Sequence, residues 1–399
     1  MHFFRAPVLA PTTAGFRFLS DAAVIVSEEG RLESLTAFAD RPASEAANYA
    51  PAGLLLPPLV DCHIHIPQFP IRGRFMEGVR PPGGLLEGLA RNVYPAEARC
   101  VDPTVARQVA REFLEDTRSN GTLGGVAYMT SHPAAVRAAL EELPETWRVG
   151  LVLMDQNCPG ELMISVDDAV VAFRTLFADF GQRVVVTDRF AVACSSRLRR
   201  AASAVAAELG MTTQTHLSEQ PAELAAVARL YPDARHYTGV YDRDGLLGPG
   251  TLLAHCLHLS DEEWGLLGER GCAVCHCPVS NTALGSGTLD LSRLAEFGVP
   301  WALCTDVGAS PSTSLLEELS HFLEVHAGRP WGGLATPEVG LLHATVAARE
   351  LAGVAVGGLT PGAAFGALEF AAAVPAGATA GEVIRALFGA KPVRVLGGG

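Results

Sequence analysis

The sequence has few basic residues for its length. Its 399 residues include 30 lysines and arginines against 43 aspartates and glutamates, which gives a formal net charge of −13. A surface that binds a polyanion needs a surplus of positive charge. We therefore expect no nucleic-acid partner.

Long apolar runs are also missing. No stretch approaches the roughly 20 uninterrupted apolar residues that a membrane-spanning helix needs. The first residues include apolar side chains, but Arg5, Pro7 and Pro11 interrupt them, and no basic segment precedes an unbroken apolar run. We expect no signal peptide and no membrane partner.

The cysteines do not suggest a disulfide framework. There are nine, an odd number, and several lie inside apolar runs, as Cys62 and Cys304 do. A reduced thiol in such a run behaves as a small apolar side chain. This pattern indicates a reducing compartment, and we expect a cytoplasmic location.

Strand-like apolar runs recur along most of the chain, and each is followed by a turn and then by a segment of helical periodicity. The order predicts an α/β protein with a closed parallel (β/α)8 TIM barrel. Five segments are expected helices, several of which open with a capping Ser or Asp: Val101–Ser119, Ser165–Phe180, Ser195–Leu209, Gln220–Leu230 and Ser312–Ala327. The eight expected strands are Leu54–His65, Gly121–Thr130, Val149–Asn157, Val184–Cys194, Met211–Glu219, Thr251–Leu259, Cys272–Pro278 and Pro300–Val307.

The two ends of the chain have a different pattern. Short apolar stretches before residue 54 alternate with turn-like residues, which is typical of a small β element. The tail after Leu351 is rich in Ala and Gly and should return to that element. We predict a small β-sandwich domain from residues 1–53 and 352–399, and a barrel over residues 54–351.

Polar residues with metal-binding side chains lie near the carboxyl ends of the expected strands. His63 and His65 end the first run, His216 the fifth, His255 the sixth and Asp306 the eighth. The carboxyl ends of barrel strands meet at one face, where active sites form. Alone, the His-x-His is a weak signal, and Asp306 is equally explained as a helix cap. Their shared position favours a catalytic site for zinc or a similar ion, with an open position for water.

A second metal site is a competing interpretation. The segment Cys272–Cys277 contains a Cys-x-x-Cys, which is also found in zinc knuckles. No second pair of suitable spacing follows it, so a buried seventh strand is the better interpretation. The paired motifs of cytidine-deaminase zinc sites are absent as well.

With these residues the chain resembles the amidohydrolase superfamily, whose signature is a His-x-His after strand one, a His after strands five and six, and an Asp after strand eight. The resemblance implies that His63, His65, His216 and Asp306 bind one zinc ion, with Fe²⁺ as the alternative ion. It also implies that His255 contacts the attacking water and the reacting carbon. The fourth run ends without a lysine that could bridge two ions, which favours a single ion.

Glu219 follows His216 by three residues and could enter the same pocket. Deamination needs a proton on the attacked ring and another on the departing amine, and a carboxyl group held in the pocket supplies both. The resemblance implies this role for Glu219. The alternative is an acid that only stabilises the first turn of a helix.

Several short strings resemble the guanine deaminases of this superfamily. They include His63–Gln68, Tyr94–Glu97 and Arg189–Ala191. The resemblance implies that Gln68 and Arg189 bind the polar edge of the base and that Phe190 packs beside it. An arginine only donates hydrogen bonds, so it suits the C6 carbonyl oxygen of guanine and disfavours adenine. Two alternatives remain: Arg189 pairs with Asp188 or another acid, and Gln68 only orients a loop.

The sequence departs from that pattern at four places, one of which is a short C-terminal β segment that lacks the expected Asp-Ala string. Gly88 stands where a tryptophan is usual, Asp188 replaces a proline, and Gly308–Ser310 has fewer glycines than usual. The predicted function is zinc-dependent hydrolysis of guanine to xanthine and ammonia by a homodimer, with a small purine-type base as the partner molecule. The alternatives are a deaminase of 8-oxoguanine, a pterin or a triazine, and a catalytically silent barrel used for binding.

Overall fold

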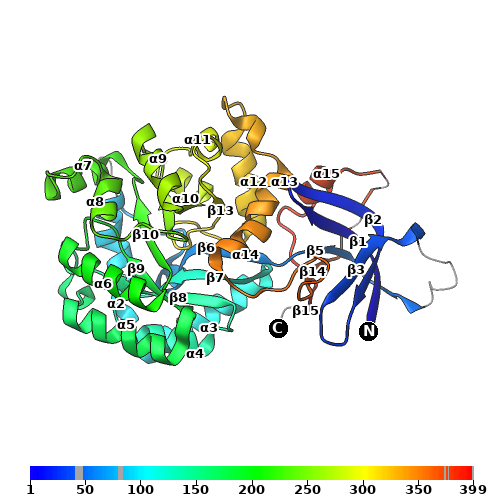
Figure 1. Ribbon diagram of the computed structural model, residues 1–399, viewed down its shortest axis with the longest axis horizontal. Coiled ribbons are helices and arrows are strands. Elements are labelled where there is room, and N and C mark those ends of the chain that lie inside the picture. The colour runs from blue at the N-terminus through cyan, green and yellow to red at the C-terminus, as the bar shows by residue number, and fades with distance from the viewer. Residues whose placement is uncertain (41–47, 80–83, 373, 376, 398–399) are drawn as a thin grey trace.

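Eight parallel strands form the larger sheet of the computed structural model, which describes residues 1–40, 48–79, 84–372, 374–375 and 377–397 (Figure 1). Their order in the sheet follows their order in the sequence. The expected strands are all present, but shorter than predicted: β6 (Leu59–His65), β7 (Thr122–Tyr128), β8 (Trp147–Leu153), β9 (Val184–Asp188), β10 (Thr213–Leu217), β11 (Leu252–His255), β12 (Ala273–His276) and β13 (Trp301–Leu303).

The sheet nearly closes between its first strand and the segment that follows its last. The Asp306 N–H donates to the His63 carbonyl oxygen at 2.9 Å, and the His65 N–H donates to that of Val307 at 2.6 Å. The Asp61 carboxylate crosses the same seam and accepts a hydrogen bond from the Thr305 hydroxyl at 2.6 Å. The predicted barrel is therefore confirmed, and its closure holds the ends of β6 and β13 side by side.

Helices connect the strands, and the five predicted helices are confirmed. Ser165, Ser195 and Ser314 each accept a hydrogen bond from a backbone N–H in the first turn of the helix that follows. No helix within the described ranges is long and apolar enough to cross a membrane. The helices over residues 85–352 are α1 (Leu85–Gly88), α2 (Tyr94–Arg99), α3 (Pro103–Ser119), α4 (Pro133–Glu142), α5 (Val166–Phe180), α6 (Ser196–Leu209), α7 (Pro221–Leu230), α8 (Tyr237–Arg243), α9 (Asp261–Arg270), α10 (Pro278–Ala283), α11 (Leu291–Glu296), α12 (Leu315–His326), α13 (Pro337–His343) and α14 (Val346–Ala352).

The terminal segments form a second sheet, at the right of Figure 1. It is a seven-stranded sheet with the order β15-β14-β5-β1-β2-β3 and with β4 paired to β1. The C-terminal tail returns to the N-terminal strands as predicted. It contributes the strands β14 and β15, and α15 (Ala380–Arg385) lies between them in the sequence. The strands are β1 (His2–Thr12), β2 (Gly15–Val26), β3 (Leu32–Ala37), β4 (Ala50–Pro51), β5 (Leu54–Leu56), β14 (Gly366–Phe370) and β15 (Arg394–Gly397).

The run predicted as one strand, Leu54–His65, is two strands in different sheets. β5 pairs with β1 and β14, whereas β6 starts the barrel. Pro57 and Pro58 separate them, and a proline has no N–H for a ladder hydrogen bond. The barrel strands therefore begin at Leu59.

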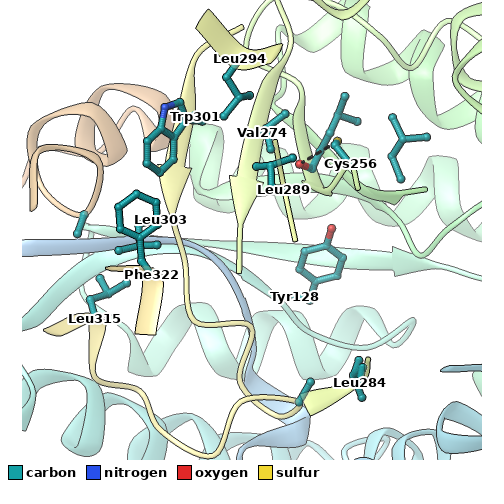
Figure 2. Packing of buried hydrophobic residues seen from close by; sticks show 14 of the residues in the cluster. Tyr128, Cys256, Val274, Leu284, Leu289, Leu294, Trp301, Leu303, Leu315 and Phe322 are labelled. Carbon is teal, nitrogen blue, oxygen red and sulfur yellow. Dashed lines mark hydrogen bonds between the residues drawn. The ribbon is translucent and has the colours of Figure 1, made fainter. Parts of the chain in front are cut away.

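The barrel core is built from strands that are buried along their whole length. All seven residues of β6 and all four of β11 and β12 are buried. Figure 2 shows part of this core, where Trp301 of β13 packs on Phe322 of α12 with ring centroids 5.8 Å apart. Tyr128, at the end of β7, packs instead against His63 and His65, with ring centroids 4.9 Å and 4.5 Å away.

Gly125 on β7 tests how tightly this core holds β6. A Cβ atom at Gly125 would lie 1.9 Å from the Asp61 carbonyl oxygen, two residues before His63. Because that atom belongs to the backbone, Gly125→Ala should lower the free energy of unfolding by about 2 kcal/mol or more, measured by urea denaturation. Gly160→Ala is the control, since nothing lies within 4 Å of its Cβ position and its backbone is unstrained. Equal stability of the two variants would contradict this packing.

Candidate metal and substrate site

Three histidines and one aspartate converge at the carboxyl ends of the barrel strands. One ligand atom from each of His63, His65, His216 and Asp306 lies within 4.8 Å of the others. The Nε2 atoms of His63 and His65 each lie 3.2 Å from Asp306 Oδ1, and His216 Nε2 lies 3.3 Å from His65 Nε2. The fold brings these residues together although His63 and Asp306 are 243 positions apart in the sequence.

The protonation of this cluster matches what a divalent cation requires of its ligands. Burial lowers the pKa of His63, lowers that of His216 well below its ordinary value, and lowers that of His65 to about 3. Burial raises the pKa of Asp306, but the adjacent His63 and His65 side chains outweigh this effect and hold the pKa well below its usual range. Neutral imidazoles beside an ionised carboxylate are the forms that bind a metal.

The imidazole of His216 is oriented by a backbone group. Its Nδ1 lies 2.7 Å from the Arg189 carbonyl oxygen, which only accepts, so Nδ1 carries the proton and Nε2 keeps its lone pair. Nε2 of His63 is buried and has no hydrogen-bond partner among the described residues. A buried acceptor without a partner is costly, and an ion among these atoms removes that cost. The residues present therefore fit a divalent ion.

His255 lies beside the cluster. Its Nδ1 is 2.9 Å from Asn281 Oδ1, and its Nε2 is 3.9 Å from Asp306 Oδ2 and 3.7 Å from Glu219 Oε2. Both His255 and Asp306 have a left-handed backbone, with φ of 72° and 53°. Such strain in residues other than glycine concentrates at functional sites, and here it turns both side chains into the barrel mouth.

Glu219 enters the same pocket just beyond β10. It is 2% exposed, and its Oε1 accepts a hydrogen bond from the Ser286 hydroxyl at 2.9 Å. Burial and the neighbouring Asp306 charge raise the pKa of Glu219 to about 8. A carboxyl group with this pKa carries its proton at neutral pH and can donate it. The first turn of α7 is stabilised instead by Glu223, which accepts from the Glu219 and Gln220 N–H groups.

Gln68, Arg189 and Phe190 all line the pocket in front of the metal-binding cluster. Arg189 pairs with an acid, as one alternative predicted. That acid is Glu97 on α2 and not the neighbouring Asp188. Gln68 donates to the same Glu97 carboxylate oxygen at 3.0 Å. Both residues are nearly fully buried. The rest of the lining is His65, Phe75, Leu85, Leu89, His216, Glu219, Glu223, His255, Leu284 and Asp306.

Two departures from the expected pattern, Gly88 and Asp188, have local structural explanations. A Cβ at Gly88 would lie 2.6 Å from a ring carbon of Phe75, so Phe75 fills the space beside Gly88 and lines the pocket. Asp188 does not reach the pocket and pairs with the buried Arg199. A Cβ at Gly308 would lie 2.8 Å from the Gln68 Cβ, so the small residue lets the two segments meet.

The Cys-x-x-Cys segment does not form a zinc knuckle. Cys275 lies on the buried strand β12, as the preferred interpretation predicted, and all nine cysteines are free. Across the described part of the chain, the His63, His65, His216 and Asp306 group is the one cluster of three or more His, Cys, Asp or Glu residues close enough to share an ion.

The sequence did not indicate several residues that support the site. Ser280 donates to Asp306 Oδ2 at 2.6 Å, and Ser286 donates to Glu219. Asp61 accepts from the His63 N–H at 3.1 Å, and burial raises its pKa to about 6. A serine or an acid next to a strand is common in any protein, so only the folded arrangement identifies these contacts. Glu97 did lie within one of the strings that carried the resemblance, which was a usable signal.

Comparison with known proteins agrees with this geometry. The family model described as the amidohydrolase family matches residues 54–391, which is most of the chain. The chain belongs to the amidohydrolase family. A Deinococcus radiodurans protein named probable guanine deaminase is 33% identical over an alignment of 391 residues, covering 92% of this chain and 86% of that protein.

Two further amidohydrolase-like proteins extend the comparison. The Escherichia coli guanine deaminase is 32% identical over 280 residues, covering 68% of this chain and 62% of that protein, so this match spans less than two thirds of the relative. A solved structure of guanine deaminase from C. acetobutylicum with bound guanine superposes with a TM-score of 0.82 at 25% identity, covering 92% of this chain and 90% of that one.

The metal cluster makes a direct prediction. We expect the purified protein to bind about one divalent ion per chain, and His216→Ala to lose most of it, because one of the few ligands of a site of this kind is removed. Elemental analysis after gel filtration measures the ion. The control is His321→Ala, since His321 lies on α12 and contacts Glu324 and Thr282 away from the cluster. Full retention of the ion by His216→Ala would contradict the assignment.

Proposed function

We propose that the protein hydrolyses guanine to xanthine and ammonia with the help of one bound zinc ion. The observation that carries the proposal is that a single pocket contains metal-binding residues, Glu219, and the two polar residues Gln68 and Arg189. Guanine is the base whose C6 carbonyl matches the arginine donors. The names of the relatives support the same substrate.

The metal-binding residues in this proposal are His63, His65, His216 and Asp306. When bound, the ion acts as a Lewis acid that lowers the pKa of water toward ~7. Asp306 keeps one carboxylate oxygen near His63 and His65, and the Ser280 hydroxyl fixes the other. We assign to Asp306 the acceptance of the proton from the attacking water.

Glu219 supplies the protons on the substrate side. Its carboxyl group donates its proton to N3 as water attacks C2. The resulting carboxylate takes the proton of the new C2 hydroxyl and passes it to the departing amine, so that the C2–N bond breaks, ammonia leaves and the C2 carbonyl of xanthine forms. The proton that Asp306 accepted from the water then returns to Glu219, which restores both groups. His255 lies within 4 Å of both Glu219 and Asp306 and would hold the water and the reacting carbon between them. Phe190 packs beside the base.

The proposal includes three features that come from the resemblance and the sequence. Zinc is the proposed ion, a homodimer the proposed assembly and the cytoplasm the proposed location. The free state of all nine cysteines supports a reducing compartment. We also propose a division into residues 1–53 with 352–399 and residues 54–351. The two separate sheets support it, although β5, at the start of the second range, pairs with the terminal strands.

Ammonia release tests the activity. We expect the zinc-loaded protein to release ammonia from guanine and to prefer guanine over 8-oxoguanine, a pterin and a triazine. Glu219→Gln should lower kcat by about 10²–10⁴-fold, since general acid–base catalysis contributes about that much. Glu263→Gln is the matched control, a buried carboxylate in the α9 capping box outside the pocket. A fully active Glu219→Gln variant, or a preference for another base, would refute the assignment.

The pH dependence follows from the raised pKa of Glu219. The reaction needs the protonated carboxyl group at its start, so kcat should fall as pH rises through about 8, where that group loses its proton. Steady-state rates from about pH 6 to about pH 10 measure this limb, with the titration of guanine itself followed separately by absorbance. The residual activity of Glu219→Gln should lack the limb. A rate that rises through the same range would contradict the role of Glu219 as an acid.

A further inference from the structure

One buried carboxylate joins the two residues that we assign to the polar edge of the base. Oε1 of Glu97 accepts hydrogen bonds from both Gln68 Nε2, at 3.0 Å, and Arg189 Nη1. Glu97 is fully buried on the short helix α2 and does not line the pocket, whereas Gln68 and Arg189 do. Glu97 therefore lies behind the two residues that face the substrate.

The carboxylate fixes which end of the Gln68 amide faces the pocket. An ionised carboxylate only accepts hydrogen bonds, so the amide must turn its NH₂ group toward Glu97. The amide carbonyl oxygen is then left without a donor among the described residues, and it is presented as an acceptor. Without the carboxylate, an amide could flip and present its donor instead, because the two ends have nearly the same shape.

The same carboxylate fixes Arg189. It occupies one N–H of the guanidinium and balances the buried positive charge, since an unpaired charge in this position would be costly. Within the described residues, no other acceptor bonds to the guanidinium, so its remaining N–H groups are available as donors. The pocket thus offers donors from Arg189 next to one acceptor from Gln68.

This order of groups matches one kind of heterocycle edge. A ring with a carbonyl at C6 and an N–H at N1 presents an acceptor followed by a donor, which complements Arg189 and Gln68. A ring with an amino group at C6 and an unprotonated N1 presents the reverse order and leaves buried groups unmatched. We propose that Glu97 is a positioning residue that sets the donor–acceptor order of the pocket and thereby selects bases with the lactam edge, C6=O with N1–H. This inference rests on the proposed function.

Binding of two analogues tests the role without turnover. Hypoxanthine has the lactam edge, purine lacks it, and neither carries the C2 amino group. We expect calorimetry to show that the wild-type protein binds hypoxanthine more tightly than purine by roughly tenfold or more. Glu97→Gln keeps the volume but no longer fixes the amide, so it should weaken hypoxanthine binding by roughly tenfold and change purine binding by less than about twofold.

Matched variants separate positioning from loss of structure. Asp244→Asn removes a buried carboxylate that pairs with Arg199 outside the pocket, and it should leave both affinities unchanged. If Glu97→Gln does not fold, Glu97→Asp keeps the charge but withdraws it by one methylene, and the same selective loss is expected. Equal weakening of both analogues, no weakening of either, or no wild-type preference for hypoxanthine would overturn the proposal. A wild-type protein that prefers hypoxanthine but releases no ammonia from guanine would refute the proposed function alone.

Discussion

The structure depends on holding three imidazoles and one carboxylate together in a buried place. An ionised carboxylate is expensive to bury, and so are ring nitrogens that find no hydrogen-bond partner. Asp306 is stabilised by His63, His65 and the Ser280 hydroxyl, but Nε2 of His63 has no hydrogen bond from any described residue. A divalent cation among these atoms would balance the carboxylate charge and accept the lone pair of the ring nitrogen. Without the ion, burying these groups lowers the stability of the fold.

The closed barrel brings these four residues together. Closure of the sheet joins the end of β6 to the segment after β13 by backbone hydrogen bonds, so His63 and Asp306 meet without long connecting loops. Asp61 reinforces the seam through Thr305. The negative charge of Asp306 then acts on Glu219, whose pKa it helps to raise. One carboxylate thus contributes both to the ion site and to the acid beside it.

The barrel and the metal-binding residues were predictable from the sequence, because the barrel topology determines where the residue at the end of each strand lies. His63, His216 and Asp306 each follow a strand-like run, and a parallel barrel brings all such positions to one face. Helix starts were predictable where a serine caps them, as at Ser165. The break between β5 and β6 was missed because apolar residues lie on both sides of it, and only the two prolines between the strands mark it.

Contacts between side chains from distant segments could not be predicted. The bond from Glu97 to Arg189 joins residues 92 positions apart, and nothing in either neighbourhood specifies the partner. The packing of Phe75 beside Gly88 could not be predicted either, because a glycine in the sequence does not indicate which side chain occupies the space next to it. Such contacts set the shape and polarity of the pocket, so the sequence predicts the chemistry better than the substrate.

The convergence of four ligands on a single ion is the central claim, and X-ray absorption at the zinc edge of the metal-loaded protein tests it most directly. We expect about four nitrogen and oxygen neighbours at about 2.0–2.2 Å, including imidazoles, with no sulfur shell. A sulfur shell at about 2.3 Å would place the ion on cysteines instead and would contradict the account.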